Sequence, residues 1–100
     1  MSQERGGDRL FLVTPTGEET PVVGERFIIG RARDCDLRLE SRIASCRHAV
    51  ILREGEGHLI RDLASSGGVW INDRRLREPR PLSEGDELRL ADVKLRVSFR

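Results

Sequence analysis

The stretch Val93-Lys94-Leu95-Arg96-Val97-Ser98-Phe99 alternates apolar and polar residues without a break. A period of two is typical of a β-strand that buries one face and leaves the other in water. Leu88 and Leu90 repeat the alternation just upstream, and the Ala91-Asp92 pair between the two segments predicts a tight hairpin. The C-terminal end of the chain is therefore predicted to form two paired strands.

Similar short apolar segments occur throughout the rest of the chain. They are separated by turn signals such as Pro15-Thr16-Gly17 and Gly55-Glu56-Gly57. This close punctuation leaves no room for a helix of ordinary length, so the pattern predicts an all-β fold, either a sandwich or a barrel. The further strands are expected at residues 10–13, 27–29, 37–39, 49–52, 58–60 and 69–71.

Length, charge and cysteine content limit the possible functions. One hundred residues suit one domain, expected over residues 9–100 after a flexible tail at residues 1–8. A net charge of +1 gives no overall field toward nucleic acid or an anionic membrane, so neither is an expected partner. No secretory signal or membrane-length apolar run is visible, and Cys35 and Cys46 fit a reduced, cytoplasmic setting better than a disulfide. The chain is either a stand-alone module or one domain of a longer protein.

Three predicted loops concentrate polar residues that suit an anionic ligand. The first contains Gly30-Arg31, the second Ser45-Cys46-Arg47-His48 and the third Ser65-Ser66-Gly67-Gly68. Loops at one end of a rigid β scaffold can converge on a single ligand. A guanidinium and nearby hydroxyl groups would bind phosphate through charge-assisted hydrogen bonds. The two His and two Cys lack paired ligand spacing, so neither a metal nor another cofactor is expected.

These segments resemble the motifs of the forkhead-associated (FHA) domain family. The family pattern is Gly-Arg, then Ser-x-x-His, then Ser-x-Asn-Gly-Thr followed by Val-Asn-Gly, then Leu-x-x-Gly-Asp. Four motifs in matching order carry far more weight than any one of them, and the similarity runs over residues 26–97. The matching segments here are Gly30-Arg31, Ser45-Cys46-Arg47-His48, Ser65-Ser66-Gly67-Gly68-Val69 with Ile71-Asn72-Asp73, and Leu82-Ser83-Glu84-Gly85-Asp86.

The resemblance implies a β-sandwich of about ten or eleven short strands, with the ligand site in the loops at one end. It implies that Arg31 holds a phosphate while the hydroxyls of Ser45 and Ser66 donate to it, and that His48 steadies the loops without touching the ligand. The phosphopeptide-binding residues implied in this way are Arg31, Ser45, Cys46, Arg47, Ser66 and Gly67, with Gly30, His48 and Asn72 as structural motif residues.

By the same resemblance, the chain is expected to be a non-catalytic bacterial module that binds phosphothreonine segments made by a Ser/Thr kinase and that can be tethered to further domains. Two positions depart from the pattern: Gly67 replaces the Asn that bonds the peptide main chain, and Cys46 replaces an Arg or Asn that assists the phosphate. These departures keep an alternative open, namely a phosphate-independent interaction or assembly module with a degenerate phosphate pocket. No nucleophile is paired with a base, so an enzyme is not expected.

Two other features have both a functional and an ordinary interpretation. Arg74, Arg75, Arg77 and Arg80 form a basic cluster that could bind nucleic acid, but Glu78 and the near-neutral total favour an ordinary charged loop. Trp70 alternates with apolar neighbours and is expected on the outward face or rim of its strand.

Overall fold

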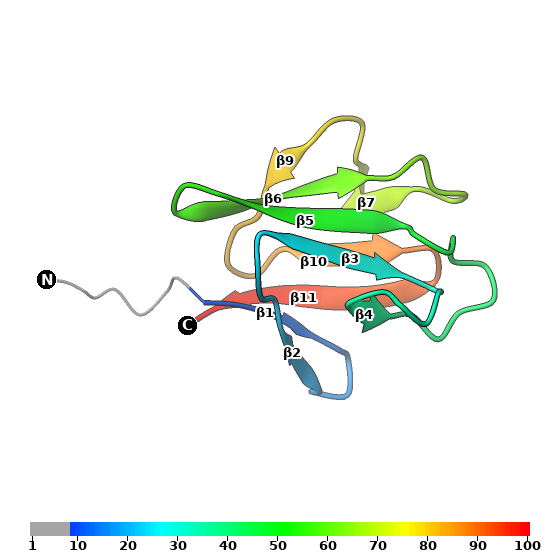
Figure 1. Cartoon of the computed structure of the whole chain (residues 1–100), viewed down its shortest axis with the longest axis horizontal. Coiled ribbons are helices and arrows are strands. Elements are labelled where there is room, and N and C mark those ends of the chain that lie inside the picture. The colour runs from blue at the N-terminus through cyan, green and yellow to red at the C-terminus, as the bar shows by residue number, and fades with distance from the viewer. Residues whose placement is uncertain (1–8) are drawn as a thin grey trace, which may run out of the picture.

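The computed structural model describes residues 9–100, and the tail predicted at residues 1–8 lies outside the described residues. The described part contains eleven strands and no helix, so nothing in it could cross a membrane as a helix. Figure 1 shows the strands stacked in two layers. The strands are β1 (Leu10–Val13), β2 (Glu19–Pro21), β3 (Arg26–Gly30), β4 (Leu37–Arg38), β5 (Ala49–Glu54), β6 (Gly57–Asp62), β7 (Val69–Ile71), β8 (Arg74–Arg75), β9 (Arg80–Pro81), β10 (Glu87–Leu90) and β11 (Val93–Phe99).

Two sheets make up the fold, which confirms the predicted sandwich and excludes the barrel. One sheet has the order β2-β1-β11-β10-β7-β8, and the other has the order β4-β3-β5-β6-β9. β1 pairs with β11, so the two ends of the described chain are joined within one sheet. Every strand pair is antiparallel except β3 with β4. Such a scaffold leaves the loops at its ends to face solvent.

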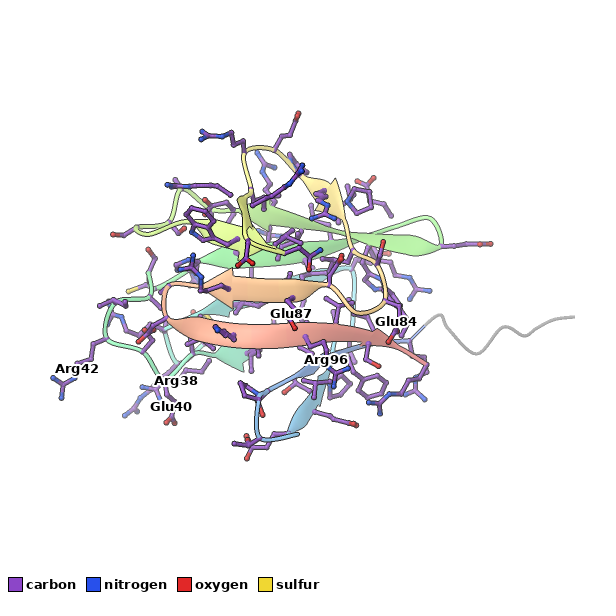
Figure 2. All side chains as sticks on the ribbon, turned by 180° about the vertical axis from the view of Figure 1, so that it is seen from behind. Arg38, Glu40, Arg42, Glu84, Glu87 and Arg96 are labelled. Carbon is purple, nitrogen blue, oxygen red and sulfur yellow. The ribbon has the colours of Figure 1, made fainter. Side chains whose placement is uncertain are left out.

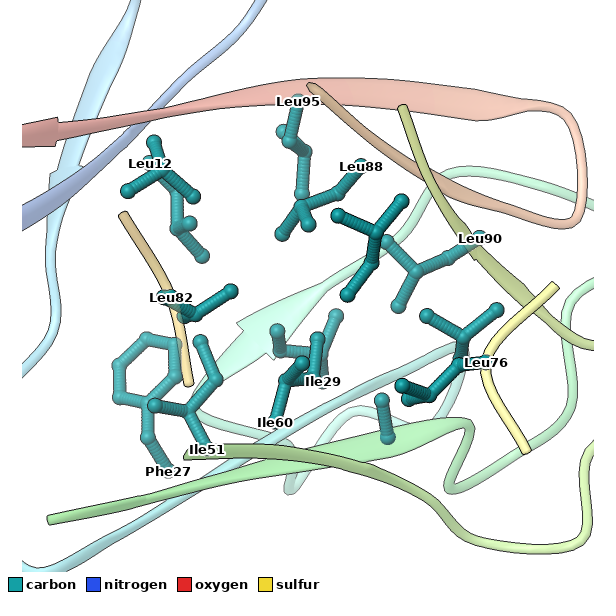
Figure 3. Close-up of a cluster of buried hydrophobic side chains, with 14 of the residues drawn as sticks. Leu12, Phe27, Ile29, Ile51, Ile60, Leu76, Leu82, Leu88, Leu90 and Leu95 are labelled. Carbon is teal, nitrogen blue, oxygen red and sulfur yellow. The ribbon is translucent and has the colours of Figure 1, made fainter. Parts of the chain in front are cut away.

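The core fills the space between the two sheets (Figure 3). β11 follows its predicted alternation, since Leu95 and Val97 are buried while Lys94 and Arg96 are exposed. Each fully buried Leu, Ile or Val side chain contributes about 1.5–3 kcal/mol relative to an exposed one. The core includes Leu12, Leu88, Leu90, Leu95 and Val97 from one sheet and Phe27, Ile29, Ile51 and Ile60 from the other.

Ser98 differs from the expected pattern, because this polar residue of β11 is buried. It lies opposite Phe11 in the β1–β11 register. The Arg100 guanidinium lies 4.7 Å from the centre of the Phe11 ring, and its Nε donates to Ser98 Oγ at 3.4 Å. Ser98 therefore faces away from the core but is covered by the last residue of the chain.

Two tight turns join neighbouring strands of the six-stranded sheet. The predicted hairpin at Ala91-Asp92 is present, with Ala91 at φ 57° and Leu90 paired to Val93. β7 and β8 are joined by Asn72 and Asp73, whose φ values are 50° and 69°. Two successive residues at positive φ are typical of a type I′ turn, which suits Asn and Asp.

Candidate functional site

Three loops meet at one end of the sandwich, where β3 ends, β5 begins and β6 ends (Figure 1). The first loop follows β3 at Gly30, the second precedes β5 at Ala49, and the third follows β6 at Asp62. Because β3 and β5 are antiparallel neighbours, the end of one lies beside the start of the other. The sheet therefore brings together the three sequence motifs that were predicted to share a ligand.

The first and second loops are joined by their backbones. The Arg31 N–H donates to the Ser45 carbonyl at 2.9 Å, and the Ala32 N–H donates to the Cys46 carbonyl at 3.1 Å. The approach is so close that a Cβ on Gly30 would overlap the Cys46 carbonyl oxygen. Only glycine fits this position without moving the backbone.

The Arg31 side chain is exposed but held in place. Its Nε donates to the Ala44 carbonyl at 2.9 Å, and its Nη2 lies 3.5 Å from Cys46 Sγ. No carboxylate within residues 9–100 lies within 4.0 Å of this guanidinium. Its positive charge is therefore both oriented and uncompensated within the described chain, which is the condition that favours an incoming anion.

Ser45 connects the second loop to the third. Its Oγ accepts a hydrogen bond from the Ser66 N–H at 2.9 Å. Because that bond uses a lone pair of the oxygen, the Ser45 hydroxyl keeps its proton for another acceptor. The Ser66 side chain is exposed on the third loop.

His48 lies beneath these loops and is fully buried. Its Nδ1 accepts from the Ser45 N–H at 3.1 Å, and its Nε2 lies 2.8 Å from the Gly68 carbonyl. The hydrogen-bond network assigns the proton to Nε2, which then donates to Gly68. His48 thus bridges the second and third loops and has no route to a ligand.

The third loop turns through two glycines with positive φ, Gly67 at 91° and Gly68 at 79°. The Ser65 N–H donates to Asp62 Oδ1 at 3.0 Å, and Trp70 Nε1 donates to the Gly67 carbonyl at 3.1 Å. The loop is therefore fixed from both flanking strands. Nothing lies within 4 Å of a Cβ placed on Gly67, so the space for a larger side chain is open.

Cys46 and Arg47 occupy the rim of the site, and both are exposed. Arg47 Nη2 forms an ion pair with Asp34 Oδ2 at 2.7 Å, so its guanidinium is directed to the first loop. Cys35 donates its thiol to the Cys46 carbonyl at 3.2 Å, and both cysteines are free. Burial raises the pKa of the Cys35 thiol above its ordinary value, which disfavours its thiolate.

Asn72 belongs to a separate bracing cluster. Its side-chain amide donates to Asp86 Oδ1 at 3.0 Å, and its Oδ1 accepts from the Glu87 N–H at 2.9 Å. Asp86 in turn accepts from the Ser83 N–H at 2.8 Å. The cluster ties the β7–β8 turn to the turn before β10, and it shares no contact with Arg31.

Some contacts at the site had no signal in the sequence. The Ala44 carbonyl orients Arg31, and Asp34 occupies Arg47, yet neither residue type indicates such a role by itself. Within the described residues, no group of three or more His, Cys, Asp and Glu side chains is arranged to hold a metal ion.

Comparison with known proteins gives consistent matches. The model of the FHA domain family matches residues 27–91. The transcriptional regulatory protein EmbR of Mycobacterium tuberculosis is 38% identical over 77 residues, which cover 77% of this chain and 20% of EmbR. The chain thus spans about a fifth of the length of that curated relative.

Two solved structures share the fold closely. Mycobacterium tuberculosis EmbR in complex with a low affinity phosphopeptide superposes with a TM-score of 0.87 at 33% identity, covering 91% of this chain and 24% of that one. An FHA domain studied for phosphothreonine-dependent interactions superposes with a TM-score of 0.85 at 28% identity, covering 92% of this chain and 97% of that one.

Proposed function

Because this chain belongs to the FHA domain family, we propose that its three loops bind phosphothreonine within a segment of another protein. The observation that carries the proposal is the arrangement of Arg31, Ser45 and Ser66 at one end of the sandwich. The related structures support it, since one contains a phosphopeptide and the other concerns phosphothreonine-dependent interactions.

The chemistry of the three groups suits a phosphate. Phosphothreonine carries close to two negative charges at pH 7 and three acceptor oxygens. Arg31 offers a guanidinium that has no carboxylate within 4.0 Å among residues 9–100, and the hydroxyls of Ser45 and Ser66 each offer a donor. Since the Arg31 side chain is already held by the Ala44 carbonyl, little of its conformational entropy remains to be lost on binding.

The two departures from the family pattern predict a weakened form of the same activity. Gly67 supplies no side-chain contact to the peptide main chain, and one missing hydrogen bond costs about 0.5–1.5 kcal/mol. Cys46 places a weakly polar sulfur beside Arg31 where the family has a strong donor. Binding therefore depends more heavily on Arg31 than it would if the family's side chains were present at positions 67 and 46.

A phosphopeptide array tests the proposal. Each spot pair carries the same sequence with threonine or phosphothreonine, and the array is probed with wild type, Arg31→Ala and Arg26→Ala. Arg26 is exposed at the start of β3, the end of the strand opposite to Arg31. Arg26→Ala is therefore the control, because it removes the same positive charge at a position away from the three loops. We expect phosphate-dependent spots for wild type and Arg26→Ala and their loss for Arg31→Ala. Equal binding of wild type to the threonine and phosphothreonine versions of each sequence would contradict the proposal.

In this account the domain is a non-catalytic reader of Ser/Thr kinase products, tethered to further domains in a longer bacterial protein and working in the cytoplasm. EmbR supports the tethering, since the match covers only 20% of it. The free cysteines, Cys35 and Cys46, support a reducing compartment.

A second candidate function is phosphate-independent docking through the outer face of the six-stranded sheet. An open groove of about 360 Å³ lies over β7, β10 and β11 there, lined by Trp70, Arg89 and Lys94 among others. Figure 2 shows this face, with Glu87 of β10 and Arg96 of β11, which are cross-strand partners. If partner binding survived Arg31→Ala but was lost in Trp70→Ala, this candidate would replace the first.

A further inference from the structure

A second concentration of positive charge lies on the segment that runs from β7 to β9. Residues 71–72 and 74–81 line an open pocket of about 580 Å³, which we call the arginine pocket. Four of its lining residues are arginines, and Glu78 is its only acidic lining residue. The arginines are Arg74, Arg75, Arg77 and Arg80.

These charges are poorly compensated within the described chain. Arg80 has a carboxylate partner, Asp86, at the long distance of 4.0 Å. Arg74, Arg75 and Arg77 have none within 4.0 Å among residues 9–100. All three are exposed, so their guanidinium groups are open to an external anion. Guanidinium groups bind carboxylate and phosphate in bidentate geometry, and several around one concavity reinforce one another.

The backbone beneath the arginine pocket is firmly held. Ile71 and Leu76 are buried in the core, and the Leu76 N–H donates to the Val69 carbonyl at 2.7 Å. Pro79 and Pro81 restrict the far side of the segment. The arginines therefore project from a rigid base, which makes their spacing usable for recognition.

Arg75 links the arginine pocket to the third loop of the phosphate site. Arg75 lies against Gly68, where a Cβ would come within 2.7 Å of Arg75 Nε. Trp70 lies opposite Arg75 in the β7–β8 register, 5.9 Å from its guanidinium, and donates to the Gly67 carbonyl. Gly67 is exposed and Gly68 is covered by Arg75, so a peptide that passes over Gly67 would meet Arg75 at the edge of the arginine pocket.

We propose that the arginine pocket binds anionic side chains of the same protein segment whose phosphothreonine occupies the three loops. The inference rests on the proposed function and names its ligand more closely, as a phosphothreonine flanked by acidic or further phosphorylated residues. Charge complementarity and the contact between Arg75 and Gly68 carry it. The net charge of +1 gives the domain no general attraction for nucleic acid, so an acidic protein segment is the occupant.

The test uses fluorescence anisotropy with peptides of one length. Their central residue is threonine or phosphothreonine, and their flanks carry Glu, the neutral Gln, or phosphoserine, placed N-terminally or C-terminally. A short DNA duplex serves as a further probe. The proteins are wild type, Arg74→Gln with Arg77→Gln, and the control Arg26→Gln with Arg53→Gln. The control removes the same charge from β3 and β5, and Arg75 is left in place because it touches the third loop.

We expect the wild type and the control to bind the Glu-flanked phosphothreonine peptide about three- to tenfold more tightly than its Gln-flanked version. In Arg74→Gln with Arg77→Gln this ratio should fall below about twofold, with unchanged binding of the Gln-flanked peptide. A larger ratio for phosphoserine than for Glu would identify the anionic side chain as a second phosphate, and the reverse would identify it as a carboxylate.

Other results separate the two claims. A Glu-to-Gln ratio that is the same in the wild type and the pocket variant would overturn the inference while leaving phosphothreonine binding intact. A duplex that binds more tightly than the Glu-flanked peptide, and is lost in the pocket variant, would overturn it in favour of nucleic acid. Equal binding of threonine and phosphothreonine peptides would overturn the proposed function. In that case, the ratio of affinities for the unphosphorylated Glu-flanked and Gln-flanked peptides, compared between the wild type and the pocket variant, would show whether the arginine pocket binds acidic side chains.

Discussion

The hydroxyl oxygen of Ser45 accepts a hydrogen bond from the backbone N–H of Ser66 at 2.9 Å, across 21 residues of sequence. This bond holds the second and third loops together. It also places the two hydroxyl-bearing residues side by side with the Ser45 proton free to donate. A site that is already assembled loses less entropy when it binds, which favours affinity even with few contacts.

Replacing Ser45 by Ala should weaken both binding and folding. The change removes a donor to the phosphate, worth about 1.5–3 kcal/mol because the acceptor is charged, and leaves the Ser66 N–H without its partner, at about 0.5–1.5 kcal/mol. Ser66→Ala is the matched control, since it removes a hydroxyl but keeps that N–H bond. We expect reduced phosphopeptide affinity in both and reduced stability to urea in Ser45→Ala alone. Wild-type affinity in Ser45→Ala would exclude Ser45 from the phosphate contact.

His48→Ala should destabilise the whole domain by roughly 2–4 kcal/mol. The variant leaves a cavity and two unpaired backbone groups, the Ser45 N–H and the Gly68 carbonyl. His48→Gln, which can still reach the Gly68 carbonyl, should fall between Ala and wild type. Urea unfolding measures all three. A loss below about 0.5 kcal/mol in His48→Ala would show that the loops do not depend on this bridge.

Gly67→Asn should strengthen phosphopeptide binding by up to about tenfold, the value of one hydrogen bond to the peptide main chain. The site has room, because nothing lies within 4 Å of the new Cβ. Any side chain at a φ of 91° strains the backbone, but Asn tolerates positive φ better than most residues, so the loss of stability should be smaller than for Gly67→Ala. Gly67→Ala is the control, because it also introduces backbone strain but has no side-chain amide. Equal affinities for Asn and Ala, measured by calorimetry, would show that no peptide group lies within reach.

Lowering the pH should destabilise the domain through His58. Burial, together with the positive charge of Arg53, lowers the pKa of His58 from its ordinary 6.5. The unfolded chain therefore takes up a proton near pH 6.5 that the folded protein still excludes. The free energy of unfolding should decrease as the pH falls below about 6.5 and level off below the folded-state pKa.

His58→Leu isolates this effect from other titrating groups. Its imidazole is buried, and Nδ1 has no hydrogen-bond partner within residues 9–100, so a neutral apolar replacement should be tolerated. Urea unfolding between pH 7 and pH 5 should show a smaller loss of stability in the variant than in the wild type. An identical pH dependence in the two proteins would rule out His58 as the group responsible.

The longer strands could be predicted from the sequence because β10 and β11 alternate apolar and polar residues over four or more positions, and β1 is a continuous run of four apolar residues. Three of the four edge strands, β2, β8 and β9, could not be predicted in this way. They contain two or three mostly polar residues, so no period can be recognised in them, and only their partner strands define them. Short, polar edge strands also limit unwanted pairing between molecules.

For the site, the motifs identified which loops to examine but not how they are connected. Arg31 and His48 were recognisable from their neighbours in sequence. The Ala44 carbonyl that orients Arg31 depends on the path of a loop 13 residues away, and no residue type signals it. The ion pair of Arg47 with Asp34 likewise appears only when the first and second loops are brought together, and it turns Arg47 toward the first loop.

The central claim is that three loops converge on one phosphate, and a titration of the ¹⁵N-labelled domain followed by NMR tests it most directly. The titrant is a phosphothreonine peptide selected from the array, with its unphosphorylated counterpart as control. We expect the largest shift changes at the Arg31 Nε–H and at the backbone amides of Arg31, Ser45 and Ser66, with the phosphorylated peptide alone. Changes centred on the outer face around Trp70, or changes that are the same without the phosphate, would contradict the account.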